Sequence, residues 1–128
     1  LLLLTDAIFV AIDNAKAHCG VKRGPSVSID CRIDPTSERL VLDVRNSVAS
    51  GVRTSAVEKN LARIRKVIST GAAYSGARRE GGSGFIKIAA ALRHSAEGQM
   101  EFGFESDSEF RMLLSFKPTQ YTIAVIRT

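Results

Sequence analysis

Apolar residues recur at helical spacing in three segments of this 128-residue chain. In the first segment, residues 6–20, Thr5 or Asp6 can cap a helix and Gly20 can end it. One face of this predicted helix collects apolar residues at Ile8, Ala11, Ile12 and Ala15.

The second helical pattern begins at Thr54 or Ser55, and its apolar stripe consists of Val57, Leu61, Ile64 and Ile68. The third follows the glycine-rich residues 81–84, and its stripe consists of Phe85, Ile88, Ala89 and Leu92. Residues 71–79, between these two helices, are small, polar and basic, and we interpret them as a mobile loop.

Period-two alternation predicts strands in the remaining segments. Residues 27–33 place Val27, Ile29, Cys31 and Ile33 on one face. Residues 40–44 place Leu40, Leu42 and Val44 inward, and we expect this strand to end at residues 45–47. Turn chemistry at residues 34–37 joins the two strands into a hairpin.

A second hairpin is predicted near the end of the chain, with its turn at residues 106–108. Its inward positions are Met100, Phe102, Phe104, Phe110, Met112, Leu114 and Phe116. We expect the four phenylalanines to lie in the core. Residues 121–126 are rich in β-branched side chains and are expected to add an edge strand or to belong to a partner interface.

This order of elements predicts an α+β fold, a two-layer α/β sandwich with helices on one face of a mixed, mostly antiparallel sheet. With 45% apolar residues, residues 1–128 are enough for a single domain with its own core. No apolar run reaches 18 residues, so a soluble, cytoplasmic domain is expected. The chain does not begin with Met, which favours a piece of a longer protein.

The two cysteines, Cys19 and Cys31, have no metal or redox spacing and are expected to be reduced thiols. Cys31 falls in a strand pattern, where we expect it to act as a small hydrophobic residue.

The net charge of +5 and a pI near 9.6 favour an anionic partner, either a nucleotide phosphate or a nucleic acid. Six Phe, two Tyr and no Trp argue against a nucleic-acid interface built on aromatic stacking. The densest basic groups are Arg78 with Arg79, beside the glycines, and a helical cluster at Lys59, Arg63, Arg65 and Lys66.

Two features carry candidate chemistry. The glycines of residues 81–84 would let a phosphate approach the backbone at a helix start, although the same residues would also serve as a flexible joint. On the first helix, Val10, Asn14 and His18 form a stripe at spacing i, i+4, i+8. Asn14 is a candidate Mg²⁺ ligand, with a simple helix-surface position as the alternative, and His18 is interpreted as an ordinary helix-end residue.

Three separated segments together resemble the Bergerat-fold (GHKL) ATPases, a superfamily that includes DNA gyrase and the catalytic domains of histidine kinases. The segments are the asparagine helix around Asn14, the strand that runs into Asn46, and the glycine loop that opens a helix at residues 81–84. The resemblance extends over residues 5–117, and histidine-kinase-like ATP-binding domains are the most similar branch.

The resemblance implies that ATP and Mg²⁺ are the cofactors and that Asn14 coordinates the metal. Asn46 stands where the family usually has the Asp that reads the adenine amino group, with a strand-ending turn residue as the alternative. Gly82, Ser83 and Gly84 would wrap the phosphates, and Lys87, Arg78 and Arg79 would be candidate counter-charges.

Several positions depart from the family pattern. Val10 occupies the place of the water-activating Glu or a polar Asn, and a valine can neither take a proton nor order a water. Val48 and Ser50 stand in place of glycines after Asn46, and Ile86 replaces a further glycine.

The sequence therefore favours an adenine-nucleotide-binding domain that serves phosphoryl transfer to an acceptor on a neighbouring domain or protein partner. ATP hydrolysis by the chain itself is not expected. The alternatives are a degenerate, non-catalytic module that regulates partner contact and a basic nucleic-acid-binding domain that uses the helical cluster.

Overall fold

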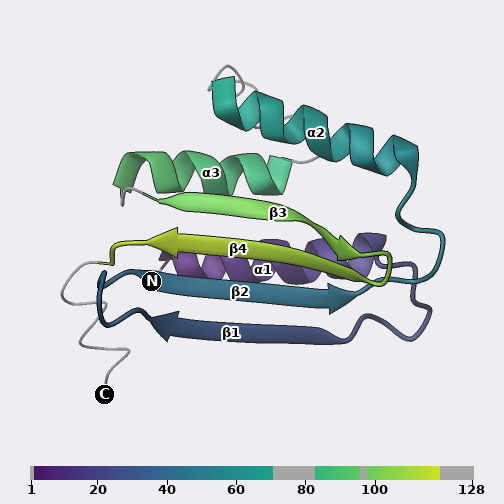
Figure 1. Cartoon of the computed structure of the whole chain (residues 1–128), viewed down its shortest axis with the longest axis horizontal. Coiled ribbons are helices and arrows are strands. Elements are labelled where there is room, and N and C mark those ends of the chain that lie inside the picture. Colours follow the sequence, from purple (N-terminus) through teal and green to yellow (C-terminus); the bar gives the residue numbers. More distant parts are fainter. Residues whose placement is uncertain (1, 71–82, 96–97, 119–128) are drawn as a thin grey trace.

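The computed structural model describes residues 2–70, 83–95 and 98–118. Its elements, in chain order, are α1 (Leu2–His18), β1 (Val27–Ile33), β2 (Leu40–Ser47), α2 (Ser55–Thr70), α3 (Ser83–Ser95), β3 (Gln99–Ser106) and β4 (Glu109–Phe116) (Figure 1). This is the predicted order. The predicted loop over residues 71–79 and the predicted strand over residues 121–126 lie outside the described residues.

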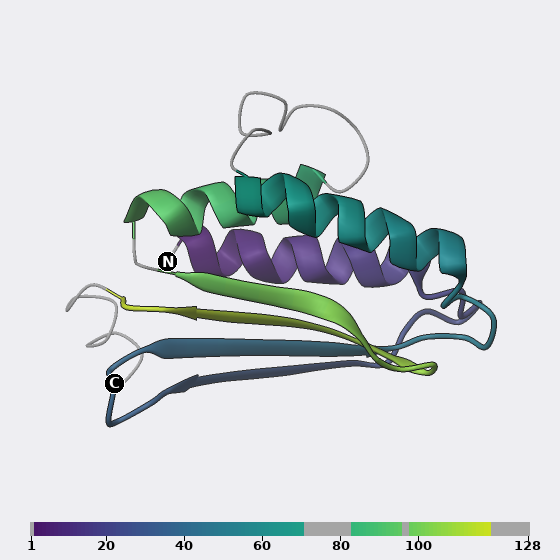
Figure 2. The ribbon, with the colours of Figure 1, turned by 45° about the horizontal axis from the view of Figure 1, so that its top comes forward.

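The four described strands form one sheet in the order β1-β2-β4-β3. Each neighbouring pair is antiparallel, so the part of the sheet that the structure describes is antiparallel and not mixed. Figure 2 shows that α1, α2 and α3 all lie on one face of this sheet. The predicted α+β sandwich with helices on a single face is therefore confirmed.

The two hairpins supply the sheet side of the core. On β2, Leu40, Leu42 and Val44 are buried, as predicted. On the second hairpin, Phe102 pairs with Met112 and Met100 pairs with Leu114 across the strands, and Phe116 is also buried. The helices cover these side chains with their predicted apolar faces, including Ala11 and Ala15 of α1, Leu61 and Ile64 of α2, and Phe85, Ile88, Ala89 and Leu92 of α3.

Strand β2 is longer than predicted. It continues through residues 45–47, because a central strand is paired on both sides: Asn46 is opposite Val27 on β1 and opposite Phe110 on β4. Asn46 is therefore a strand residue and not part of a turn, which removes the turn alternative for this side chain.

Strand β1 is less buried than its alternating pattern suggests. The helices pack over the other strands, with α1 on β2 and α3 on β3, so β1 extends beyond the helical layer (Figure 2). Ile29 is 45% exposed and Cys31 is exposed. The interpretation of Cys31 as a small hydrophobic residue is wrong in this respect, since no described helix covers it.

The helix boundaries follow local chemistry. The α1 helix begins at Leu2, before the predicted cap at Thr5 or Asp6, and Leu3 and Leu4 pack against the core. The α2 helix begins as predicted, because Thr54 Oγ1 accepts a hydrogen bond of 3.2 Å from the backbone N–H of Val57. None of the described helices is both long and apolar enough to cross a membrane.

Candidate functional site

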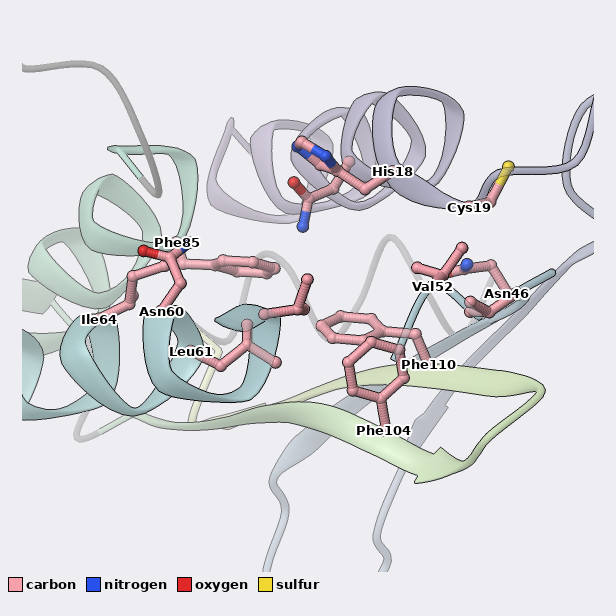
Figure 3. Close-up of a pocket in the computed structure, with 13 residues that line it drawn as sticks. His18, Cys19, Asn46, Val52, Asn60, Leu61, Ile64, Phe85, Phe104 and Phe110 are labelled. Atoms are coloured by element: carbon pink, nitrogen blue, oxygen red, sulfur yellow. The ribbon is translucent and has the colours of Figure 1, made fainter. Parts of the chain in front are cut away.

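A cavity of about 200 Å³ lies between the helical layer and the paired ends of β2 and β4 (Figure 3). Four polar side chains line it, Asn14 and His18 from α1, Asn46 from β2 and Asn60 from α2. The rest of the lining is mainly apolar and includes Val48, Leu61, Phe85, Phe104 and Phe110. In the close-up, Asn46 and Asn60 lie on opposite sides of the cavity.

Asn46 is the polar end of an otherwise apolar row. It lies on the same strand face as Leu42 and Val44 and is only 8% exposed. Its Nδ2 donates a 3.0 Å hydrogen bond to the backbone oxygen of Ser47. Among the described residues no fully buried side-chain nitrogen or oxygen lacks a partner. Asn46 Oδ1 has no protein donor there, so it retains some solvent access, and Asn46 lines the cavity.

Asn14 presents an unengaged amide from α1. The side chain is half-buried, lines the cavity and has no hydrogen-bond partner in the part of the chain that the structure describes. His18, one turn further along α1, also lines the cavity but is exposed. Of the predicted stripe of Val10, Asn14 and His18, only the last two residues therefore line the cavity.

Aromatic rings form one wall of the cavity. Phe104 and Phe110 meet edge to face with ring centroids 5.2 Å apart, and Phe85 lies 6.3 Å from Phe110. Phe85 also stacks on the buried Phe102 at 4.3 Å. The prediction that the strand phenylalanines are core residues holds for Phe102 and Phe116, whereas Phe104 and Phe110 are half-buried and face the cavity.

The segment after β2 closes one side of the site against the end of α1. The backbone N–H of Ala49 donates a 2.8 Å hydrogen bond to the oxygen of Cys19, and that of Val48 donates one of 2.8 Å to Ser108. Gly20 has a φ of +72°, and a Cβ there would lie 2.7 Å from Val52 Cγ2. Val48, which replaces an expected glycine, is buried in this wall.

The predicted phosphate-binding residues are only partly described. Gly82, Arg78 and Arg79 lie outside the described residues, and Ser83 is the first residue of α3. Lys87 is exposed on α3 and does not line the cavity. Gly84 adjoins Phe85, which does line it, so the start of α3 reaches the cavity.

Gly84 and Val10 bring α3 and α1 into close contact. A Cβ built on Gly84 would lie 2.9 Å from Val10 Cγ1 and 3.5 Å from its Cγ2. Ile86, which replaces another expected glycine, is 6% exposed and belongs to the core. Both departures from the family pattern thus have packing roles.

The residues present fit a metal ion only in the company of other ligands. The described residues contain no group of three or more His, Cys, Asp or Glu side chains that could hold a metal, and no carboxylate lines the cavity. Asn14 offers a neutral amide oxygen, which is an acceptable Mg²⁺ ligand. The remaining oxygen ligands would have to come from phosphates and water.

Sequence reasoning missed Asn60, which lines the cavity from α2. Its Oδ1 accepts hydrogen bonds of 3.3 and 3.0 Å from Nε and Nη2 of Arg63. Its spacing in the sequence could have indicated this position. Asn60 lies three residues after Val57, on the helix face that is apolar at Val57, Leu61 and Ile64.

The chain matches the family described as the y4jQ C-terminal putative histidine kinase domain over residues 1–118. Neither the comparison with curated proteins nor that with solved structures returned a match. The family match spans every described element, from α1 to β4, and includes Asn14 and Asn46. The chain therefore belongs to the y4jQ C-terminal putative histidine kinase domain family.

Proposed function

We propose that the cavity binds the adenine ring of ATP or ADP, and that the domain presents this nucleotide for phosphoryl transfer to an acceptor on a neighbouring domain or protein partner. The observation that carries the proposal is the buried Asn46 amide at one end of an apolar cavity. Family membership supports it, because histidine kinases use ATP as the phosphoryl donor.

Asn46 has the hydrogen-bonding groups that an adenine edge requires. Its accessible Oδ1 accepts from the adenine amino group, and the Nδ2 hydrogen not used by Ser47 donates to the adjacent ring nitrogen. Guanine has a carbonyl oxygen where adenine has the amino group. This oxygen and Asn46 Oδ1 are both acceptors, so they would face each other without a hydrogen bond. We therefore expect adenine to be preferred over guanine.

The apolar lining suits the faces of a purine ring. Phe85, Phe104 and Phe110 offer aromatic surface, and Leu61 offers aliphatic surface. The cavity is smaller than the roughly 300–1,000 Å³ of most ligand pockets, so it would hold the base and leave the ribose and phosphates outside.

The phosphates would extend toward the start of α3 and the Asn14 amide. A helix start offers unpaired N–H groups to anions, and Gly84 and Lys87 belong to the first turns of α3. Bound Mg²⁺ would neutralise charge on the phosphate oxygens, and Asn14 is the protein ligand we assign to it. Arg79 and Gly82, which the resemblance places near the phosphates, remain part of this proposal.

A regulatory module without chemistry is the second candidate function. It is favoured by the absence of Asp and Glu among the described residues that line the cavity, and by the packing roles of Val10, Val48 and Ile86. In this case nucleotide would bind and alter partner contact without phosphoryl transfer.

The nucleic-acid alternative is weaker, because two members of its basic cluster have other contacts. Arg63 donates to Asn60, and Arg65 donates to the backbone oxygen of Phe102 and lies over that ring, 5.1 Å from its centroid. Nucleic-acid binding that falls steeply with salt would favour this alternative.

Nucleotide titration by calorimetry and by thermal shift, with ATP, ADP and GTP in the presence of Mg²⁺, tests the proposal. A ligand that binds only the folded state raises the melting temperature, and we expect ATP and ADP to raise it more than GTP. Asn46→Leu should remove this difference, whereas the same change at the other end of the cavity, Asn60→Leu, should retain it. No shift with any nucleotide would contradict the proposal, and equal shifts with all three would remove Asn46 from base recognition.

A further inference from the structure

The outer edge of β1 offers a row of backbone groups that no described strand uses. Toward β2, the backbone oxygen of Ser26 accepts from Ser47 at 2.9 Å, and the N–H of Asp34 donates to Arg39 at 2.9 Å. On the β1 side both bonds are made by even-numbered residues. In an antiparallel sheet every second residue of a strand bonds to the same neighbouring strand, so the even positions bond to β2. The N–H and C=O groups of the odd positions, 27, 29, 31 and 33, therefore point outward.

The side chains along this edge are exposed and divide between the two faces of the sheet. Ile29, at 45% exposure, and the exposed Cys31 are paired with the buried Val44 and Leu42, so they share the face on which the helices lie. Asp30 and Arg32 share the opposite face, where they form an ion pair and each side chain is 57% exposed. The edge thus combines exposed apolar side chains with one negative and one positive charge.

We propose that the outer edge of β1 pairs antiparallel with the same edge of a second copy of this chain, with Cys31 opposite Cys31 of the second copy. This pairing would join the four described strands of each copy into one continuous sheet. It is independent of the proposed nucleotide site, which lies at the β2 and β4 end of the helix-covered face.

Charge complementarity selects the second copy as the partner and fixes the register. With Cys31 opposite its equivalent, Asp30 of each chain lies opposite Arg32 of the other, and Ile29 lies opposite Ile33. A register shift of one residue would place odd positions, whose N–H and C=O groups point outward, opposite even positions, whose groups point toward β2. The two strands could then form no ladder of hydrogen bonds. A two-residue shift would place Asp30 opposite Asp30 or Arg32 opposite Arg32, and like charges directly opposite each other are destabilising.

Charged residues on an edge strand commonly deter pairing with another chain. The charges on β1 have a different arrangement, because they are of opposite sign, two residues apart and centred on Cys31, so the edge is complementary to itself. An edge protected by charge would instead repel its own copy in every register.

Cross-linking of the full chain tests the register. In the proposed pair the two Cys31 Cα atoms lie about 5.5 Å apart, as in any hydrogen-bonded antiparallel pair, so a short bismaleimide should link them. The reaction is best run at mildly alkaline pH, because partial burial and the neighbouring Asp30 raise the pKa of the Cys31 thiol. Cys19 is buried, so Cys31→Ser should abolish the link. In that background Ser28→Cys should give no link, because its two copies would be six positions out of register, about 20 Å apart.

Charge reversal tests the partner by analytical ultracentrifugation. Asp30→Arg alone and Arg32→Asp alone each create like-charge pairs and should weaken self-association about tenfold. An equimolar mixture of the two variants should recover the affinity, since every cross-strand pair is then opposite in charge. Both sites are exposed, and melting temperatures that match wild type at dilute concentrations, where every protein is monomeric, would show that the single variants fold. A wild-type chain that stays monomeric at millimolar concentration, or a mixture that associates no better than either variant alone, would overturn the proposal.

Discussion

Gly84 on α3 lies against Val10 on α1 so closely that a Cβ on Gly84 would be 2.9 Å from Val10 Cγ1. Such a separation is shorter than side chains tolerate, and Val10 is β-branched and stiff, so it cannot easily move away. The contact gives a second reason for a glycine at a position where the sequence suggested only an approach to phosphate.

The first prediction concerns this contact. Gly84→Ala should lower the free energy of unfolding by about 1–3 kcal/mol, because the added methyl group overpacks the junction of α1 and α3. Val10→Ala removes Cγ1, the atom that the new Cβ would strike, so the double variant should lose less stability than the sum of the losses in the two single variants. Urea denaturation of all four proteins measures this coupling. Additive effects would show that the two residues do not interact.

Gly24→Ala is a control without overpacking. A Cβ at Gly24 would meet nothing within 4 Å, and the cost there comes from its φ of +89°, which disfavours an L side chain. Loss of stability at Gly24 should be independent of Val10.

The second prediction concerns Asn14 and the metal. Asn14→Ala should weaken the binding of Mg²⁺-ATP more than the binding of ATP in EDTA, because the amide oxygen is a ligand of the cation and not of the base. Calorimetric titrations in the two buffers measure the two affinities. Asp13→Ala, the neighbouring exposed position on α1, is the control and should not discriminate between them. Equal weakening by Asn14→Ala in both buffers would place Asn14 outside the metal site.

The fold was predictable because its apolar periodicities are long and regular. The stripes of α2 and α3 and the alternation of β2 and β4 each specify one buried face, and the structure buries those faces. The pattern of β1 is as regular, but periodicity reports which side chains share a face and not what covers that face. The exposure of Ile29 and Cys31 depends on where the helices end across the sheet, which is a tertiary property.

The amide side chains of the site were predictable from the sequence, but its aromatic lining was not. Asn14 and Asn46 interrupt apolar surroundings, and such interruptions are visible in the sequence. Phe104 and Phe110 occupy the same alternating row as Phe102, so nothing local distinguishes the cavity from the core. Asn60 is visible only as a break in the α2 stripe, and its relevance depends on α2 lying beside the cavity.

The third prediction concerns an ion pair on the sheet face opposite the helices. Arg111 donates hydrogen bonds of 2.9 and 2.8 Å to the two carboxylate oxygens of Asp43, and Arg45 lies 3.4 Å from Oδ2. These contacts, chiefly those from Arg111, lower the pKa of Asp43 below its usual value. Asp43 is only 7% exposed, and the loss of its charge would leave Arg45 paired with Glu109 at 3.3 Å and Arg111 paired with Glu105 at 3.5 Å.

A lowered pKa in the folded state means that Asp43 stabilises the fold fully above its unfolded pKa of about 3.9. That contribution is lost as the pH falls through the lower folded pKa. Asp43→Asn should therefore reduce the free energy of unfolding by about 1–3 kcal/mol at pH 7, and the difference from wild type should shrink below pH 4. Asp107→Asn, at the exposed pair with Arg53, should change stability little at either pH. An Asp43→Asn effect that is constant with pH would contradict the assignment.

The fourth prediction is that the purified chain does not measurably hydrolyse ATP, even at saturating nucleotide. No Asp or Glu in the described part of the chain lines the cavity, and His18, although it lines it, is exposed at the end of α1. General-base assistance typically contributes about 10²- to 10⁴-fold, so a site without a base should turn over at close to the uncatalysed rate. His18→Ala should leave this rate unchanged, and a phosphate-release assay measures it.

Substitutions at position 10 distinguish a site that lacks only a general base from a site that cannot support hydrolysis at all. Val10→Glu and Val10→Gln disturb the contact with Gly84 to a similar extent, because the two side chains have nearly the same shape, but only the carboxylate can accept a proton. We expect hydrolysis by Val10→Glu to exceed that by Val10→Gln by about 10²-fold, since Val10 lies one helical turn from Asn14 on the same side of α1. Robust turnover by the wild-type chain that His18→Ala abolishes would instead make His18 the functional base. Equal inactivity of both position-10 variants, with nucleotide binding retained, would favour the regulatory module over the phosphoryl-transfer domain.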